Sequence, residues 1–233
     1  LERTLALLPR LRSLALTGKD EKRTQTNSSP LPPNALARLE PRLSHVEANG
    51  VGRLLRSTTF WEDIVRTLMT TNIQWSGTRR LTAALVRRYG KPLEGAAPPQ
   101  PRAFPTPQTL ARTRETTLRG LGLGYRAPYL LDLARRVVSG RIDLAALQDP
   151  ARPTDDLRRD LLTLPGIGPY AAHTLLNCLG RHDYIGVDTE AVAAVSQHFF
   201  FFNDAATTEI NAVFEKWGPY KALAFWFWDY GET

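Results

Sequence analysis

The segment 164–190 combines an anion-binding turn with a carboxylate, and these are the groups of this chain whose types and spacing best suit chemistry. The turn, 164–168, reads Leu-Pro-Gly-Ile-Gly and lies between two segments that favour helices. A backbone that turns tightly there leaves amides uncovered, and a helix that begins at about Pro169 adds the positive end of its dipole. Such amides bind phosphates without reading sequence. The competing interpretation is an ordinary glycine-ended turn between two helices.

The carboxylate is that of Asp188, about twenty residues after the turn. It follows Tyr-Ile-Gly-Val at 184–187, and apolar residues then recur at helical spacing, so it lies where a helix begins. An aspartate at that place ordinarily caps the helix by accepting backbone N–H groups. A carboxylate so placed can also stabilise the positive charge that develops on a sugar while its glycosidic bond breaks, and the two roles are compatible.

Helices must position both groups, because apolar residues recur at helical spacing along much of the chain. This spacing is seen at Ile64, Val65, Leu68 and Met69, at Leu81 and Leu85, and at Leu130, Leu133, Ala134 and Val137. No convincing run of alternating apolar and polar residues predicts a strand. Segments 18–34 and 95–107 are rich in polar residues or proline and are predicted to be loops.

Composition limits the classes of function. The 233 residues are 42% hydrophobic, enough for a core, but no apolar run approaches the length of about 18 residues that crosses a membrane, so we expect a soluble protein without a membrane partner. Thirty Lys and Arg against 23 Asp and Glu give a charge of +7, which favours a polyanionic partner. The chain begins with leucine and shows no signal-peptide pattern, from which we expect the native N-terminus to lie upstream.

Cysteine and histidine usage excludes several metal sites. The chain has one cysteine, Cys178, in the apolar stretch after the turn, so a cysteine-ligated iron–sulfur cluster, a multi-cysteine zinc site and an intrachain disulfide are not possible. The four histidines, among them His173, show no metal-ligand spacing. The lack of cysteine pairs suits a reducing cytoplasm, where we expect the protein to act, associated with the nucleoid in a prokaryote.

Five segments resemble those of a known family in residue type, order and spacing. Along the chain they are 61–90 with Thr-Thr-Asn-Ile-Gln-Trp at 70–75, 121–127 with Gly-Tyr-Arg at 124–126, 164–170, Val-Asp-Thr at 187–189, and Trp-Gly-Pro-Tyr at 217–220. Together they are similar to the helix-hairpin-helix (HhH-GPD) DNA glycosylase superfamily, which includes endonuclease III, the adenine glycosylases and oxoguanine DNA glycosylase. The resemblance is nearest to the 3-methyladenine and 8-oxoguanine branch.

The resemblance implies an all-α fold in which two helical lobes flank a DNA-binding cleft. We expect an N-terminal segment, 1–58, that packs with the C-terminal lobe, then a helical lobe, 59–182, that ends in the helix-hairpin-helix. C-terminal helices, 183–233, are expected to carry the catalytic aspartate and the base pocket. Glycosylases of the oxoguanine type carry a β lobe before the helical core, and the short stretch before the match leads us to expect that this N-terminal β lobe is absent or truncated.

The expected chemistry rests on a departure from the family. Bifunctional members carry a lysine two residues after the second glycine of the hairpin, where it attacks the sugar and forms a Schiff base, and this chain has Tyr170 there. The resemblance therefore implies a monofunctional hydrolase in which Asp188 orients water and stabilises an oxocarbenium-like sugar. We expect no iron–sulfur cluster and no other cofactor, although the resemblance suggests Na⁺ or K⁺ on the hairpin carbonyls.

The last helix is expected to form the pocket, because an enzyme that acts on a base must flip it out of the stack. Aromatic rings there would stack on electron-poor alkylated purines, and the carboxylate of Asp229 would accept a hydrogen bond from the base edge. Packing in the core is the alternative for these aromatics, above all for Trp226 and Phe227. The substrate-binding candidates are Tyr170, Phe225, Trp228 and Asp229.

Residues at turns and helix ends are expected to hold the DNA. The turn at 72–75 can push a polar or flat side chain into the gap left by a flipped base. Arg79 and Arg80 are candidates for phosphate contacts, with solvated surface as the alternative. The DNA-binding candidates are Asn72, Gln74, Trp75, Arg126, Leu164, Gly166, Ile167, Gly168 and His173.

We therefore expect a monofunctional DNA glycosylase of base excision repair, acting as a monomer on double-stranded DNA with a damaged or mispaired base and leaving an abasic site. Three alternatives stay open. A bifunctional glycosylase and abasic-site lyase would use another amine, such as that of Lys221. A non-catalytic binder of damaged DNA, or a hairpin module that recruits a partner enzyme, would bind DNA and release no base.

Overall fold

The computed structural model describes residues 55–95, 100–189, 192–193, 195–196 and 207–227. The regular elements in these ranges are helices, and the β-type pairing among them is an isolated antiparallel bridge between Pro92 and Arg102. The all-α prediction is therefore confirmed for the described residues. The candidates Trp228 and Asp229, and the predicted N-terminal segment up to residue 54, lie outside these ranges.

The described helices fall into two compact units. The hairpin unit is Ser57–Leu175, and the C-terminal unit comprises the described residues from Leu176 onward with Leu55 and Arg56. Helix α11 (Pro169–Cys178) begins in the first unit and ends in the second. The domain limits after residues 58 and 182 stay predictions.

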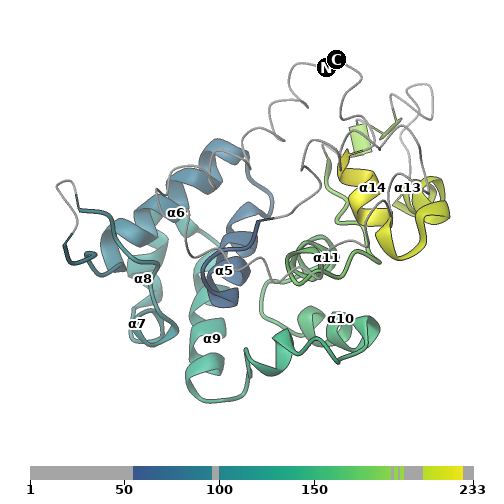
Figure 1. Cartoon of the computed structure of the whole chain (residues 1–233). Helices are drawn as coiled ribbons and strands as arrows, with labels where there is room; N and C mark the ends of the chain where they lie inside the picture. Colours follow the sequence, from purple (N-terminus) through teal and green to yellow (C-terminus); the bar gives the residue numbers. More distant parts are fainter. Residues whose placement is uncertain (1–54, 96–99, 190–191, 194, 197–206, 228–233) are drawn as a thin grey trace. The chain divides into compact units, whose positions relative to one another are not determined.

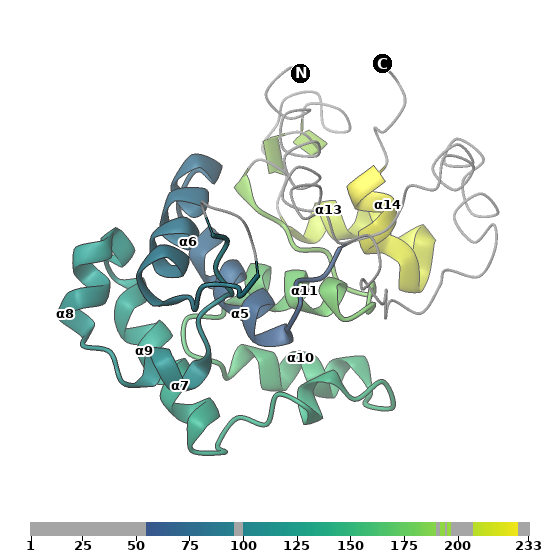
Figure 2. The same ribbon diagram turned by 60° about the vertical axis from the view of Figure 1, so that its left-hand side comes forward.

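The hairpin unit is built on α5 (Phe60–Thr70), which packs against α6 (Trp75–Tyr89) and α9 (Arg126–Val138) (Figures 1 and 2). Its other elements are α7 (Pro107–Ala111), α8 (Glu115–Leu118), the π-helical turn η2 (Arg119–Leu123), the 3-10 turn η3 (Ala146–Gln148), α10 (Thr154–Leu162) and the first part of α11. The helical spacing predicted for α5 is confirmed. The four apolar side chains that define this spacing are at most 1% exposed: Ile64, Val65, Leu68 and Met69.

Local sequence explains why α5 begins where it does. The side chain of Thr59 accepts a hydrogen bond from the amide of Glu62 at 3.2 Å, which satisfies one of the donors at the helix start. Glu62 and Asp63 place negative charge in the first turn, where the helix dipole favours it. The apolar face of α5 is thereby held at a defined register against the core.

The C-terminal unit holds α13 (Thr207–Phe214), the 3-10 turn η4 (Glu215–Tyr220) and α14 (Lys221–Phe227). Their apolar faces form one cluster with Ile185 and Val195. The amide of Ala222 donates to the carbonyl of His182 at 3.0 Å, so α14 anchors the segment that leads to Asp188. Within the described ranges, no helix combines the length and the apolarity needed to span a bilayer.

Candidate nucleic-acid interface and active site

The turn of the hairpin closes on one backbone hydrogen bond, from the amide of Ile167 to the carbonyl of Leu164, at 3.1 Å. Pro165 and Gly166 occupy its centre, and the φ of Gly166 is +75°. This is the pattern of a type II turn, in which proline suits the second position and glycine the third, where φ is positive. Leu164 and Ile167 are each 5% exposed, so they can meet a ligand mainly through their backbone.

The two glycines of the hairpin serve different needs. A Cβ atom on Gly166 would lie 2.7 Å from Leu68 Cδ1 and 2.9 Å from Tyr129 Cγ, so packing and backbone conformation both require glycine there. Gly168 is exposed, has no positive φ, and a Cβ atom on it would meet nothing within 4 Å. The amides of both glycines donate no hydrogen bond to any described residue. Because no packing or conformational reason calls for glycine at 168, that residue suits close approach by a ligand from outside the chain.

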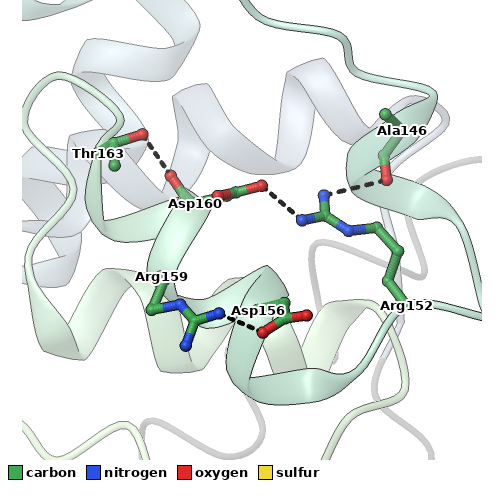
Figure 3. Close-up of polar contacts among 6 residues, drawn as sticks. All are labelled: Ala146, Arg152, Asp156, Arg159, Asp160 and Thr163. Carbon is green, nitrogen blue, oxygen red and sulfur yellow. Dashed lines mark hydrogen bonds and ion pairs between the residues drawn. The ribbon is translucent and has the colours of Figure 1, made fainter.

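Helix α10, the first helix of the hairpin, is anchored by Arg152, which precedes it (Figure 3). One guanidinium nitrogen of Arg152 lies 2.5 Å from Asp160 Oδ2, and another donates to the carbonyl of Ala146 at 3.4 Å. At the end of the helix the hydroxyl of Thr163 donates to the carbonyl of Asp160 at 2.7 Å. The charge of Arg152 therefore helps to position α10 directly before the turn.

The second helix of the hairpin, α11, is joined to α10 by a side-chain hydrogen bond. Arg158 Nε donates to His173 Nε2 at 2.9 Å, which requires that Nε2 carries no proton. His173 is half-buried, and its contact with DNA stays a prediction. Tyr170, the second residue of α11, is also half-buried, and its carbonyl accepts from the hydroxyl of Thr174 at 2.9 Å.

The turn between α5 and α6, residues 71–74 and named here the wedge turn, is held by threonine hydroxyls. Those of Thr70, Thr71 and Thr78 donate to carbonyls near the end of α5 at 2.7, 2.9 and 3.2 Å, and so satisfy acceptors that a helix end leaves open. Asn72 has a φ of +48°, a conformation that asparagine tolerates better than most residues. Asn72 and Gln74 are both exposed, as a contact with DNA requires.

Ile73 and Trp75 support the wedge turn from inside the unit. A Cβ atom on Gly77 would lie 2.5 Å from Ile73 Cγ1, so the first turn of α6 needs a glycine for Ile73 to pack there. Trp75 is half-buried, and its Nε1 is buried with no hydrogen-bond partner among the described residues. Part of the Trp75 side chain therefore belongs to the packed interior.

Arg126, a predicted DNA-binding residue, is buried, and its contact with DNA stays a prediction. It is 5% exposed, its guanidinium donates to the carbonyl of Thr71, and it lies over the ring of Tyr125 at 4.6 Å from the ring centre. The Tyr125 hydroxyl in turn lies 3.3 Å from the carbonyl of Thr71 and 3.3 Å from Asn72 Nδ2. Arg126 therefore positions the wedge turn. The sequence alone does not show this role, because Thr71 and Arg126 are 55 residues apart.

Asp188 lies in the C-terminal unit, where it is exposed and directly precedes the helical residue Thr189. Its carbonyl accepts a hydrogen bond from the amide of Val192 at 2.9 Å, as the carbonyl of an N-cap residue does. The residue predicted to be catalytic is thus carried at the start of a helix and accessible to solvent.

A buried polar network holds the segment that precedes Asp188. Asn177 is 3% exposed, and its Nδ2 donates to the carbonyl of Tyr184 at 3.1 Å. The amide oxygen of Asn177 therefore accepts from His182 Nδ1, at 2.9 Å. Burial lowers the pKa of His182 from 6.5 to about 4, which keeps the imidazole neutral. The sequence alone does not show this network, because no local pattern marks its members.

Protonation of His182 is expected to lower stability in acid. Its pKa is 6.5 in the unfolded chain and about 4 in the folded one, so below pH 6.5 the unfolded state binds a proton more readily. The difference amounts to at most about 3 kcal/mol, present in full above pH 6.5 and lost as the pH falls to about 4. Urea unfolding at several pH values between 6.5 and 4 measures this effect. As the pH falls, the free energy of unfolding should decrease by up to about 3 kcal/mol more in the wild type than in His182→Gln. Equal losses would contradict a buried neutral histidine.

Phe225 is the predicted pocket residue of α14 that the structure describes. It is half-buried, and its ring meets that of Phe214 edge to face, with ring centres 5.4 Å apart. Part of the ring therefore packs on the core of the C-terminal unit, and only its exposed part is available to a base.

The chain belongs to the HhH-GPD superfamily of base excision DNA repair proteins, whose sequence pattern matches residues 65–219. It is 27% identical to the N-glycosylase/DNA lyase of Saccharomyces cerevisiae over 147 residues, which are 59% of this chain and 37% of that protein. It is 26% identical to DNA-3-methyladenine glycosylase 2 of Escherichia coli over 167 residues, 70% of this chain and 55% of that protein. The matches thus span about half or less of these relatives.

Solved structures share the fold. The apo 8-oxoguanine glycosylase/lyase of Clostridium acetobutylicum has a TM-score of 0.71 at 22% identity, covering 85% of this chain and 69% of that one. The 3-methyladenine DNA glycosylase of Archaeoglobus fulgidus has a TM-score of 0.62 at 20% identity, covering 97% and 75%. At these identities the likeness concerns the fold alone. The sequence match confirms the predicted family, and the shared fold agrees with it.

Proposed function

We propose that this chain is a DNA N-glycosylase that hydrolyses the bond between a damaged or mispaired base and its sugar in duplex DNA, leaving an abasic site. The observation that carries the proposal is Asp188, an exposed carboxylate at a helix start within the part of the chain that matches the family. The uncovered amides of the hairpin and the exposed wedge turn support binding to a distorted duplex. Both curated relatives are named as glycosylases.

Each step of the proposed reaction has residues suited to it. The amides of Gly166 and Gly168 bind backbone phosphates, helped by the dipole of α11. Asn72 and Gln74 enter the gap in the stack as the base leaves it. Asp188 orients a water molecule and stabilises the positive charge on the sugar. The water oxygen bonds to the anomeric carbon and gives up one proton, to the Asp188 carboxylate or to solvent. The base leaves with the electron pair of the broken bond and takes up one proton.

The proposed enzyme is monofunctional because Tyr170 takes the position at which lyase members carry an amine, and a phenol cannot form an imine. A lyase would need another amine, such as that of Lys221. Its side chain is 17% exposed, and its Nζ lies 2.9 Å from Glu215 Oε2. An ion-paired ammonium has no free electron pair with which to attack a sugar, so this contact favours a hydrolase over a lyase.

A monovalent cation at the hairpin, which the family resemblance implies, would take backbone carbonyl oxygens. Those of Gly166 and Ile167 accept no hydrogen bond from the described residues, so their lone pairs suit a hard cation such as Na⁺ or K⁺. Bound there, the ion would add positive charge next to the phosphate and brace the turn.

Base release from a panel of duplexes tests the proposal. The panel contains uracil, thymine opposite guanine, hypoxanthine, oxoguanine and methylated purines, and the names of the relatives give the last two priority. We expect release of at least one base, strand breakage only after alkali, and no borohydride-trapped adduct with wild type or Lys221→Gln. Strand breakage without alkali together with a trapped adduct would show that the protein is a lyase and not a hydrolase. Tight binding of the duplexes without base release would show that it is a non-catalytic binder.

A further inference from the structure

Helix α6 differs in charge from the other arginine-bearing helices of the hairpin unit. Four arginines elsewhere in the unit pair with an acid about one turn before them: Arg66 with Glu62, Arg119 with Glu115, Arg136 with Asp132 and Arg159 with Asp156. The α6 sequence contains no acidic residue. All four of its arginines are exposed and make no ion pair or hydrogen bond with the residues that the structure describes. Arg88 lies over the ring of Tyr89, 5.6 Å from the ring centre, whereas Arg79, Arg80 and Arg87 have no such contact among the described residues. Their positive charges therefore have no described counterpart within the protein.

Two of these arginines lie on one exposed stripe of the helix. Ser76, Arg80, Ala83 and Arg87 are spaced by four, three and four positions, so they share a face, and all four are exposed. At 1.5 Å of rise per residue the two arginines are about 10 Å apart along the axis, which is about three phosphates of a DNA strand at 3.4 Å each. The small side chains of Ser76 and Ala83 leave room for a backbone to approach. The stripe thus matches a regular polyanion in charge and spacing.

The stripe also begins next to the wedge turn. Gln74, an exposed wedge residue, is the N-cap of α6, and Ser76 lies in the first turn of the same helix. A duplex engaged by the wedge turn therefore has its flanking phosphates near this face. We propose that the arginine stripe, residues 76, 80, 83 and 87, binds the phosphate backbone of the duplex beside the damaged base. This inference rests on the proposed function in taking DNA as the partner.

The salt dependence of DNA binding tests the stripe. Each neutralised phosphate contributes about 0.9 to the slope of log K against log salt, so Arg80→Gln/Arg87→Gln should reduce the slope by about 1.8. Affinity near physiological salt should fall by roughly 10-fold or more, uniformly across sequences. Arg80→Lys/Arg87→Lys should retain the slope, because lysine also neutralises a phosphate. Fluorescence anisotropy measures these values on a duplex that carries an abasic-site analogue and extends a full turn beyond it on both sides.

The matched control is Arg119→Gln/Arg136→Gln, which removes two charges that are ion-paired and have 50% and 39% exposed side chains. It should keep the wild-type slope. If the slope falls equally in the control, the effect comes from net charge alone, and the stripe proposal is wrong. An unchanged slope in the α6 variant would also overturn it, and would favour another partner such as an acidic protein surface.

Base release separates this inference from the proposed function. If Arg80→Gln/Arg87→Gln lowers the slope but the wild type releases no base, the stripe proposal is supported and the proposed glycosylase activity is wrong. If the wild type releases a base and this variant has the wild-type slope, the activity is supported and the stripe proposal is wrong.

Discussion

Replacing Asp188 by asparagine is expected to lower base release by about 10²- to 10⁴-fold and to leave DNA binding unchanged. The two side chains have nearly the same shape, and asparagine caps a helix as well as aspartate does, so the helix at Thr189 should begin at the same residue. What is lost is the negative charge that stabilises the sugar as its bond to the base breaks. Single-turnover release from the preferred duplex of the panel, with enzyme in excess, measures the effect.

Asp183→Asn is the control, because it removes a carboxylate from the same segment before the helix. It should release the base at the wild-type rate. A wild-type rate for Asp188→Asn would leave Asp188 with the role of a cap alone. A parallel loss of DNA affinity in Asp188→Asn would instead assign the carboxylate to the binding interface or to the stability of the C-terminal unit.

Gly166→Ala is expected to lower the stability of the protein, whereas Gly168→Ala is expected to lower its affinity for DNA. At 166 the methyl group would crowd Leu68 and Tyr129 at a φ of +75°, so we expect a loss of about 2 to 5 kcal/mol in the free energy of unfolding. At 168 the methyl group meets nothing, so stability should change by less than about 0.5 kcal/mol. DNA affinity should nevertheless fall about 10- to 100-fold, because the methyl group blocks the approach of a phosphate to the amide.

Urea unfolding and anisotropy on the same preparations separate these two effects. Gly120→Ala is the matched control, because Gly120 is also exposed, has no positive φ and has nothing within 4 Å of an added Cβ atom. It should alter neither stability nor affinity. If Gly168→Ala binds DNA as tightly as Gly120→Ala does, the hairpin amides do not hold a phosphate.

Local patterns predicted the features whose partners are near in sequence. The helical spacing of Ile64, Val65 and Leu68 identified α5, because burial on one helix face repeats within a few residues. Gly166 identified the turn, because glycine is preferred where the backbone has a positive φ or a side chain would clash. The renewed apolar period after Asp188 placed that residue directly before a helix, which the hydrogen bond to its carbonyl supports.

The sequence by itself therefore determined the family, the helical class, the hairpin and a carboxylate at a helix start. Only the tertiary structure decided which polar side chains support the site from inside. Arg126 is of the type that binds phosphates, yet the fold buries it on the carbonyl of Thr71. Asn177 and His182 look unremarkable in sequence, yet together they hold the segment before Asp188. The physical reason is that burial and hydrogen-bond partners depend on which elements pack together, and residue spacing along one element does not encode that choice.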